Sequence, residues 1–133
     1  MIYLDSCLVI YLIERHARWG DRVARAVAQA SRMDFAISPL VKCECLVGPI
    51  KRGDLVLQQS YTETFSEFVS LDMPEAVYLQ AAALRARFGL KTSDALHLAC
   101  AQHHRCDELW TNDERLSRGS HGMARNMLER ADR

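Results

Sequence analysis

Residues 91–100 read Lys91-Thr92-Ser93-Asp94-Ala95-Leu96-His97-Leu98-Ala99-Cys100, a polar segment that leads into an apolar run with an acid near its start. This pattern predicts a mostly buried helix with a carboxylate in its first turn. Ser93 can cap such a helix, and Asp94 can interact with the positive end of its dipole. A helix start also favours a metal or phosphate site, so this stretch alone leaves capping and a functional site as alternatives.

Short apolar runs alternate with helical patterns along the rest of the chain. The predicted strands cover residues 1–4, 35–38, 69–72 and 106–111, and residues 123–128 are either an edge strand or a helical turn. The predicted helices cover residues 7–16, 20–30, 39–48, 55–68 and 74–88, with Ser6 as a cap and a break or kink at Gly48-Pro49. Strands that alternate with helices predict a parallel sheet with helices on both faces.

Length and composition favour one soluble domain over residues 1–133. The chain is 49% hydrophobic and 26% charged, with zero net charge, so a general affinity for nucleic acid is not indicated. No apolar run reaches the roughly 18 residues of a membrane helix, and no membrane partner is expected. The N-terminus lacks the pattern of a signal peptide, so we expect a cytoplasmic protein.

The five cysteines, at positions 7, 43, 45, 100 and 106, are expected to be reduced thiols, mostly in the core. Cys100, His103, His104 and Cys106 are close enough in sequence to suggest zinc as an alternative. Adjacent histidines face different ways on a helix, however, and no second pair of ligands appears. The zinc alternative is therefore the weaker one.

Four acids lie either directly after a predicted strand or in the first turns of a predicted helix. Asp5 and Asp113 follow the first and fourth strands, Glu44 lies in the second turn of the helix after the second strand, and Asp94 opens its own helix. Ligands of parallel α/β sheets bind at the carboxyl ends of the strands. If the first and fourth strands are neighbours, Asp5 and Asp113 come close together.

Several carboxylates at one sheet edge repel each other unless they share protons or hold a cation. No lysine directly adjoins any of these four acids in the sequence. Mg²⁺ and Mn²⁺ prefer oxygen ligands and bind substrate phosphates as well. Because such an ion can activate water and stabilise the charge on a phosphodiester, the acids predict metal-dependent phosphodiester hydrolysis.

Four strings carry a resemblance to a known family: Met1–Ser6, Ser38-Pro39 followed by Glu44, Thr92–Ala99, and Trp110–Asp113. Together they resemble the PIN-domain ribonucleases, particularly the VapC-type toxins of bacterial toxin–antitoxin pairs. The strings occur in the order and at the spacing of that family, and they cover nearly the whole chain. Any one string is a weak motif, whereas four in register are specific.

This resemblance implies a single PIN domain over residues 1–133, a three-layer α/β/α sandwich with a central, mostly parallel sheet of four to five strands. It also implies an Mg²⁺- or Mn²⁺-dependent endoribonuclease. Carried over by position, Asp5 and Asp94 would be direct metal ligands, and Asp113 would bind directly or through water. Glu44 would orient or deprotonate the attacking water.

The resemblance further implies supporting residues and partners. Ser6 and Thr111 would hold the carboxylates or a metal-bound water, with Asn112 beside them. Arg115 and Arg118 follow the fourth acid and would bind substrate phosphates, although exposed arginine is the ordinary alternative. The expected partners are an RNA substrate, a cognate antitoxin and a second copy in a homodimer.

Several alternatives stay open from the residues themselves. The protein could be a PIN-type RNA-processing nuclease without a toxin role, or a PIN-like binding module without catalysis. A magnesium-binding receiver domain is much weaker, because a single acid follows the first strand and no lysine occurs after Lys91. His97, one turn from Asp94, is either a packed, hydrogen-bonded helix residue, which we favour, or a proton shuttle.

Overall fold

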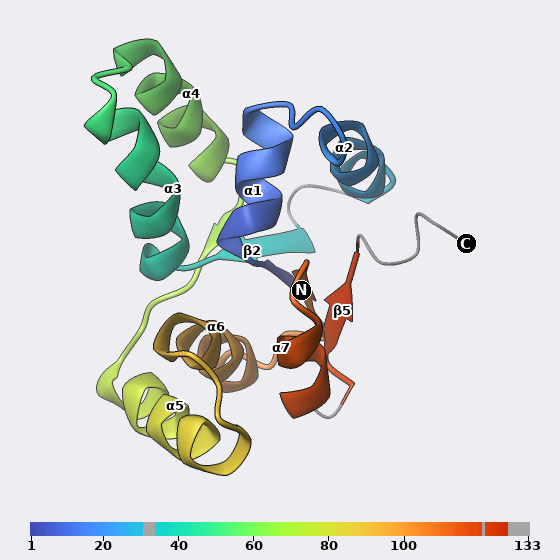
Figure 1. The fold of residues 1–133 in the computed structure, drawn as a ribbon, viewed down its shortest axis with the longest axis vertical. Coiled ribbons are helices and arrows are strands. Elements are labelled where there is room, and N and C mark those ends of the chain that lie inside the picture. The colour runs from blue at the N-terminus through green and yellow to red at the C-terminus, as the bar shows by residue number, and fades with distance from the viewer. Residues whose placement is uncertain (31–33, 121, 128–133) are drawn as a thin grey trace.

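The computed structural model describes residues 1–30, 34–120 and 122–127, without the side chains of residues 117–119. Within these residues the chain forms five strands and seven helices (Figure 1). They are β1 (Ile2–Leu4), α1 (Ser6–Ile13), α2 (Gly20–Ala28), β2 (Phe35–Ile37), α3 (Pro39–Lys51), α4 (Leu55–Phe65), β3 (Val69–Ser70), α5 (Glu75–Phe88), α6 (Thr92–His103), β4 (Glu108–Thr111), α7 (Glu114–Gly119) and β5 (Ala124–Asn126).

The five strands form one parallel sheet in the order β3-β2-β1-β4-β5. The structure thus confirms the predicted α/β class, and residues 124–126 form an edge strand. In the central pair, Ile2 lies opposite Glu108 and Leu4 lies opposite Trp110. Because the strand order reverses at β1, the carboxyl ends of β1 and β4 form the topological switch point of the sheet, where such folds bind ligands.

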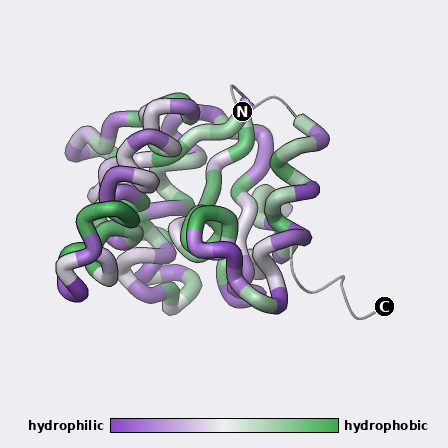
Figure 2. Tube along the Cα trace, turned by 90° about the horizontal axis from the view of Figure 1, so that it is seen from above, coloured by the Kyte–Doolittle hydropathy of each residue, from purple (hydrophilic) through white to green (hydrophobic). Residues whose placement is uncertain are grey.

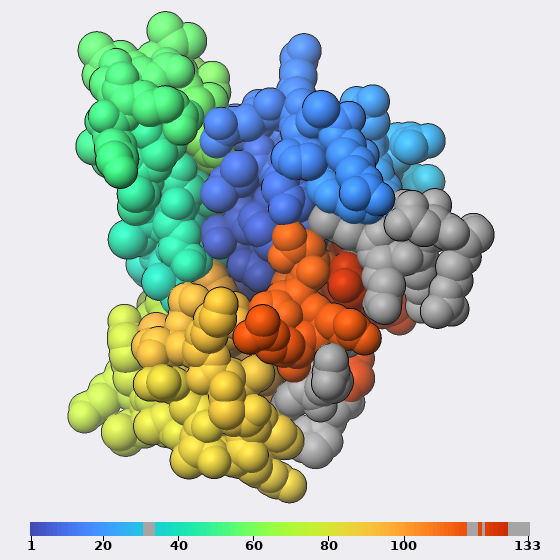
Figure 3. All heavy atoms as spheres, in the orientation of Figure 1, coloured from blue at the N-terminus to red at the C-terminus, as the bar shows by residue number. Residues whose placement is uncertain are grey.

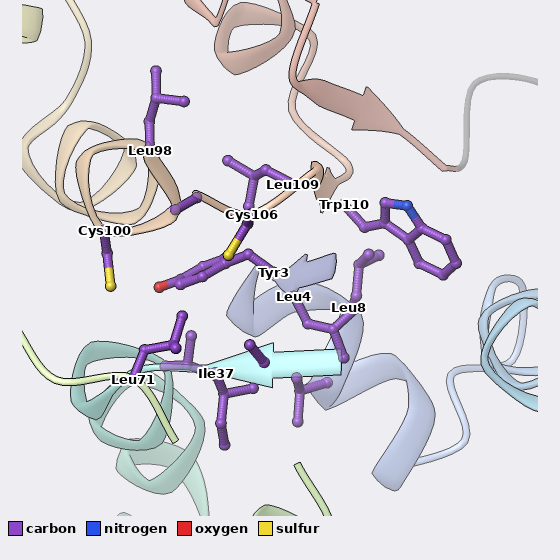
Figure 4. Packing of buried hydrophobic residues seen from close by; sticks show 14 of the residues in the cluster. Tyr3, Leu4, Leu8, Ile37, Leu71, Leu98, Cys100, Cys106, Leu109 and Trp110 are labelled. Atoms are coloured by element: carbon purple, nitrogen blue, oxygen red, sulfur yellow. The ribbon is translucent and has the colours of Figure 1, made fainter. Parts of the chain in front are cut away.

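Helices cover both faces of the sheet. In Figure 1, α1 to α4 lie above the strands and α5 and α6 lie below them, while α7 contacts α6 and β5. Figure 4 shows the core between these layers, where Tyr3 and Leu4 of β1 and Leu109 and Trp110 of β4 are buried. The three central strands, β2, β1 and β4, are mostly apolar and buried because both of their faces are covered.

The helices differ in how deeply they are buried. Along α2 the colour alternates between hydrophobic and hydrophilic in Figure 2, with Val23 and Val27 buried and Arg25 exposed. In α6 every residue from Ala95 to Ala101 is buried, because α6 lies against both α5 and the sheet. No helix in the described part of the chain is long and apolar enough to cross a membrane.

Two predicted helix caps are wrong. Asp5, and not Ser6, precedes α1 as its N-cap, and Ser6 is the first helical residue. At α6 the N-cap is Lys91, with φ −65° and ψ 154°, and no side chain caps this end. Since an N-cap residue needs a non-helical backbone and Ser93 already lies inside the helix, Ser93 cannot fill that role.

The alternative of a break at Gly48-Pro49 is also wrong, because α3 continues to Lys51, whereas a kink there stays a prediction. A proline in a helix loses its own hydrogen bond to the carbonyl four residues earlier, but the following residues can still pair. Here the Arg52 N–H donates to the Gly48 carbonyl at 3.0 Å, and Pro49 is buried. All five cysteines are free thiols, and three of them, Cys45, Cys100 and Cys106, are buried.

A prediction follows for the packing of α6. Leu98 on α6 is fully buried, so Leu98→Ala leaves a cavity and should lower the free energy of unfolding by about 2–5 kcal/mol. The matched control is Leu79→Ala on α5, where the leucine is 65% exposed and the expected change is below about 0.5 kcal/mol. Urea denaturation of both variants measures the difference, and equal losses would contradict the observed packing.

Candidate metal centre

The structure places all four predicted acids at one edge of the sheet. Asp5 follows β1 as the N-cap of α1, and Asp113 follows β4 as the N-cap of α7. Glu44 lies in the second turn of α3, and Asp94 lies in the first turn of α6. Figure 3 shows the face on which the segments that begin α1, α3, α6 and α7 adjoin. This arrangement follows from the parallel strands, whose carboxyl ends lead into these helices.

A compact group of potential metal ligands forms around Asp5, Glu44 and His97. One ligand atom from each lies within 4.8 Å of the other two, and it is the only such group among the described residues. His97 Nε2 lies 2.5 Å from Glu44 Oε1 and 3.7 Å from Asp5 Oδ1. Asp94 and Asp113 do not belong to this group.

Hydroxyl groups hold the carboxylates of Asp5 and Glu44 in place. Thr111 Oγ1 donates to Asp5 Oδ2 at 2.7 Å, and the backbone N–H of Asp113 donates to the same Thr111 oxygen at 3.1 Å. Ser6 Oγ lies 3.3 Å from Asp5 Oδ1 and 3.2 Å from Glu44 Oε1. Ser6 therefore bridges Asp5 and Glu44, and Thr111 links Asp5 to the segment that carries Asp113.

The other predicted residues at the end of β4 have different surroundings. The Asn112 side chain contacts α1, where it accepts from Cys7 Sγ at 3.2 Å and donates to the Tyr11 hydroxyl at 2.9 Å. Asp113 Oδ1 accepts from the Arg115 N–H at 2.8 Å and so caps α7. The Arg115 side chain is exposed, and the side chain of Arg118 lies outside the described residues.

Electrostatics couples Asp94 to the other acids. Burial, followed by the charges of Asp113 and Asp5, raises the pKa of Asp94 above its ordinary value of 3.8, against the opposing effects of His97 and Lys91. A raised carboxyl pKa means that the site disfavours another negative charge. Asp94 therefore shares one region of negative potential with Asp5 and Asp113.

Glu44 shows the opposite shift. Burial by itself raises its pKa, but the hydrogen bond from His97, the charge of that ring when protonated, and the bond from Ser6 together hold the pKa of Glu44 below its ordinary value. Glu44 is therefore an ionised carboxylate at neutral pH. The donor set of this edge consists mainly of carboxylate and hydroxyl oxygens, which fits a hard divalent cation such as Mg²⁺ or Mn²⁺.

His97 is the site residue that the sequence did not assign. The structure confirms the favoured interpretation of a packed, hydrogen-bonded helix residue, because His97 is 1% exposed and both ring nitrogens have partners. It also places His97 in contact with Glu44. The available signal was its position three residues after Asp94, which puts both side chains on one face of the helix.

The comparisons with known proteins give the following similarities. The PIN-domain family model matches residues 2–121, and no curated protein matches the chain. A toxin–antitoxin complex from Klebsiella pneumoniae is 25% identical, with a TM-score of 0.79 over 96% of this chain and 98% of that chain.

Two further solved structures share the fold at lower identity. VapBC2 from Rickettsia felis, bound to a DNA fragment from its promoter, is 22% identical, with a TM-score of 0.76 over 94% of this chain and 98% of that chain. VapC20 from Mycobacterium tuberculosis, a sarcin-ricin loop cleaving toxin, is 14% identical, with a TM-score of 0.75 over 89% of this chain and 94% of that chain.

The repulsion at Asp94 predicts a stabilising substitution. Because folding raises the pKa of Asp94, the folded state binds that proton more tightly than the unfolded state does, and the charged carboxylate opposes folding at neutral pH. In metal-free buffer, Asp94→Asn should therefore have a higher Tm than the parent at pH 7. This advantage should shrink as the pH falls through the raised pKa of folded Asp94 and should be lost below about 4, where Asp94 is protonated in both states.

The control for this measurement is Asp54→Asn. Asp54 is an exposed N-cap that accepts from the Leu57 N–H at 3.0 Å, and asparagine caps a helix about as well as aspartate. Its Tm should stay close to that of the parent at pH 7. A lower Tm for Asp94→Asn at pH 7 would show that Asp94 is not under electrostatic repulsion.

Proposed function

Because the family model matches residues 2–121, this chain belongs to the PIN-domain family, and on that premise we propose that it is a metal-dependent endoribonuclease and the toxin of a toxin–antitoxin pair. The observation that carries this proposal is the shared edge of the sheet on which Asp5, Glu44, Asp94 and Asp113 lie. Residues 1–133 act as one domain in this proposal, and the protein acts in the cytoplasm.

Asp5, Asp94 and Asp113 would hold the metal ion. When bound, Mg²⁺ or Mn²⁺ supplies water activation and stabilises the negative charge that develops on the phosphodiester. Thr111 and Ser6 keep the Asp5 carboxylate in one orientation, which reduces the cost of ordering it when a ligand binds. The Asp113 carboxylate is held in a similar way by the N–H of Arg115 in the first turn of α7.

Glu44 would orient the attacking water and take its proton. Its Oε1 is engaged by His97 and Ser6, whereas Oε2 has no hydrogen-bond partner among the described residues. As an ionised carboxylate it can accept the proton while the water oxygen bonds to phosphorus and the bond to the leaving ribose oxygen breaks. Arg115, together with Arg118, is placed in sequence to bind flanking phosphates of single-stranded or loop RNA.

A protein partner is supported by an exposed apolar surface at the junction of α3 and α4. Val47 and Ile50 of α3 and Leu55 and Val56 of α4 are between 58% and 80% exposed. Neighbouring exposed apolar residues of this kind are typical of protein-binding surfaces. The solved relatives from Klebsiella pneumoniae and Rickettsia felis are toxin–antitoxin assemblies, so we propose a cognate antitoxin as one partner and a second copy of the chain as another.

The first functional prediction concerns RNA cleavage in vitro. The purified protein should cleave single-stranded or loop RNA with Mg²⁺ or Mn²⁺ and stop cleaving in excess chelator. Asp94→Asn should lower kcat more than about 100-fold, because the change removes a charged ligand, whereas Asp54→Asn should keep parental activity. Gel analysis of cleavage products measures the activity of both variants. Undiminished cleavage by Asp94→Asn in chelator would contradict the metal-dependent mechanism.

The second functional prediction separates a toxin from an RNA-processing enzyme. Induced expression of the parent in a bacterial host should arrest growth, whereas Asp5→Ala at matched protein levels should not. Growth curves and immunoblots measure this difference. An active nuclease that causes no arrest would favour the alternative, a PIN-type processing nuclease without a toxin role.

A further inference from the structure

We propose that Tyr3 and His97 are positioning residues that hold the Glu44 carboxylate through a directed chain of hydrogen bonds from the sheet core. This inference rests on the proposed function, since it concerns the acid that would take the proton from water. The residues come from three separate elements, β1, α6 and α3. Neither Tyr3 nor His97 would touch the substrate.

The chain of contacts is continuous and buried. The Tyr3 hydroxyl lies 2.7 Å from Ser38 Oγ and 2.6 Å from His97 Nδ1, and His97 Nε2 lies 2.5 Å from Glu44 Oε1. Tyr3 and Ser38 are 0% exposed and His97 is 1% exposed. Figure 4 shows the Tyr3 ring extending from β1 through the core toward α6.

The available acceptors determine which atom donates in each of these hydrogen bonds. The Val41 N–H donates to Ser38 Oγ at 3.4 Å, and the Tyr3 oxygen is the hydrogen-bond acceptor that the structure offers to the Ser38 hydroxyl. Tyr3 then donates its own hydrogen to His97 Nδ1, which leaves the proton of His97 on Nε2, facing Glu44. In this arrangement every hydrogen in the chain has an acceptor, as expected for buried polar groups.

The Glu44 side chain needs a partner to fix its orientation, because it lies at the border between core and solvent. Its side chain is 31% exposed, so by itself it could adopt several rotamers. The His97 ring cannot rotate freely, since both of its nitrogens are bonded and its edge packs against Tyr3 with ring centres 5.6 Å apart. Because His97 and Ser6 both bind Glu44 Oε1, they hold the Glu44 carboxylate in one orientation next to Asp5.

The main rival role for His97 is that of a metal ligand, because Nε2 also lies 3.7 Å from Asp5 Oδ1. The two roles predict different metal affinities. If His97 positions Glu44, His97→Gln should change the Kd for Mn²⁺ less than about 3-fold in calorimetry, whereas loss of a ligand should weaken binding at least about 10-fold. A weakening of that size would overturn the positioning role.

Kinetics of single and double variants test the positioning role. His97→Gln should lower kcat about 10- to 100-fold and Tyr3→Phe about 3- to 10-fold, with KM within about 2-fold of the parent. In a Glu44→Gln background, neither change should lower kcat further, because both act through Glu44. Losses that multiply independently would indicate a merely structural role.

The matched control is Tyr61→Phe. Tyr61 is also fully buried, but its hydroxyl donates to Glu14 Oε2 at the end of α1. Its loss of stability should resemble that of Tyr3→Phe, whereas its kcat should equal the parental value. Should His97→Gln fail to fold, the Tyr3→Phe and Tyr61→Phe pair still decides the question, and equal kcat values in that pair would contradict the proposal.

Imidazole ¹⁵N NMR of the metal-free protein provides a test that does not depend on nuclease activity. At pH 7.5 the parent should show a proton on His97 Nε2, and the ¹⁵N shift of Nδ1 should change in Tyr3→Phe but not in Tyr61→Phe. An Nε2 without a proton would overturn the inference. Failure to cleave any RNA, with the expected NMR result, would instead contradict the proposed function.

Discussion

The parallel pairing of β1 with β4 is the constraint on which the rest of the site depends. The pairing continues one residue beyond β1, because the Asp5 N–H donates to the Trp110 carbonyl at 3.0 Å. Thr111 therefore lies beside Asp5 and can donate its hydroxyl hydrogen to that carboxylate. Since both strands end at the same edge, α1 and α7 begin there as well, and each carries an acid into the site.

The site tolerates its negative charge without a permanent cationic side chain. Among the described residues, neither lysine nor arginine forms an ion pair with Asp5, Glu44, Asp94 or Asp113. Hydroxyl groups and one imidazole supply the hydrogen bonds instead, and these leave repulsion among the carboxylates. Repulsion among the carboxylates lowers the stability of the metal-free protein and favours the binding of a divalent cation. Such a loss of stability is common at functional sites.

Local sequence patterns were sufficient to predict most of the fold. Alternating strand and helix patterns predicted the parallel α/β sheet, because hydrophobic periodicity depends on residues a few positions apart. The strand-end positions of Asp5 and Asp113 followed from the same patterns. The errors at Ser6, Ser93 and Pro49 concern helix boundaries, where a shift of one residue changes which group can cap a helix.

The sequence by itself thus determined the order of the elements and the position of each acid within its element. Only the tertiary structure decided which strands are neighbours and which side chains meet. Tyr3 and His97 are 94 residues apart, and His97 and Glu44 are 53 residues apart, so no local pattern reports their contacts. Those contacts exist because the sheet order and the packing of α6 bring three distant segments together, and their polar groups must then be paired inside the core.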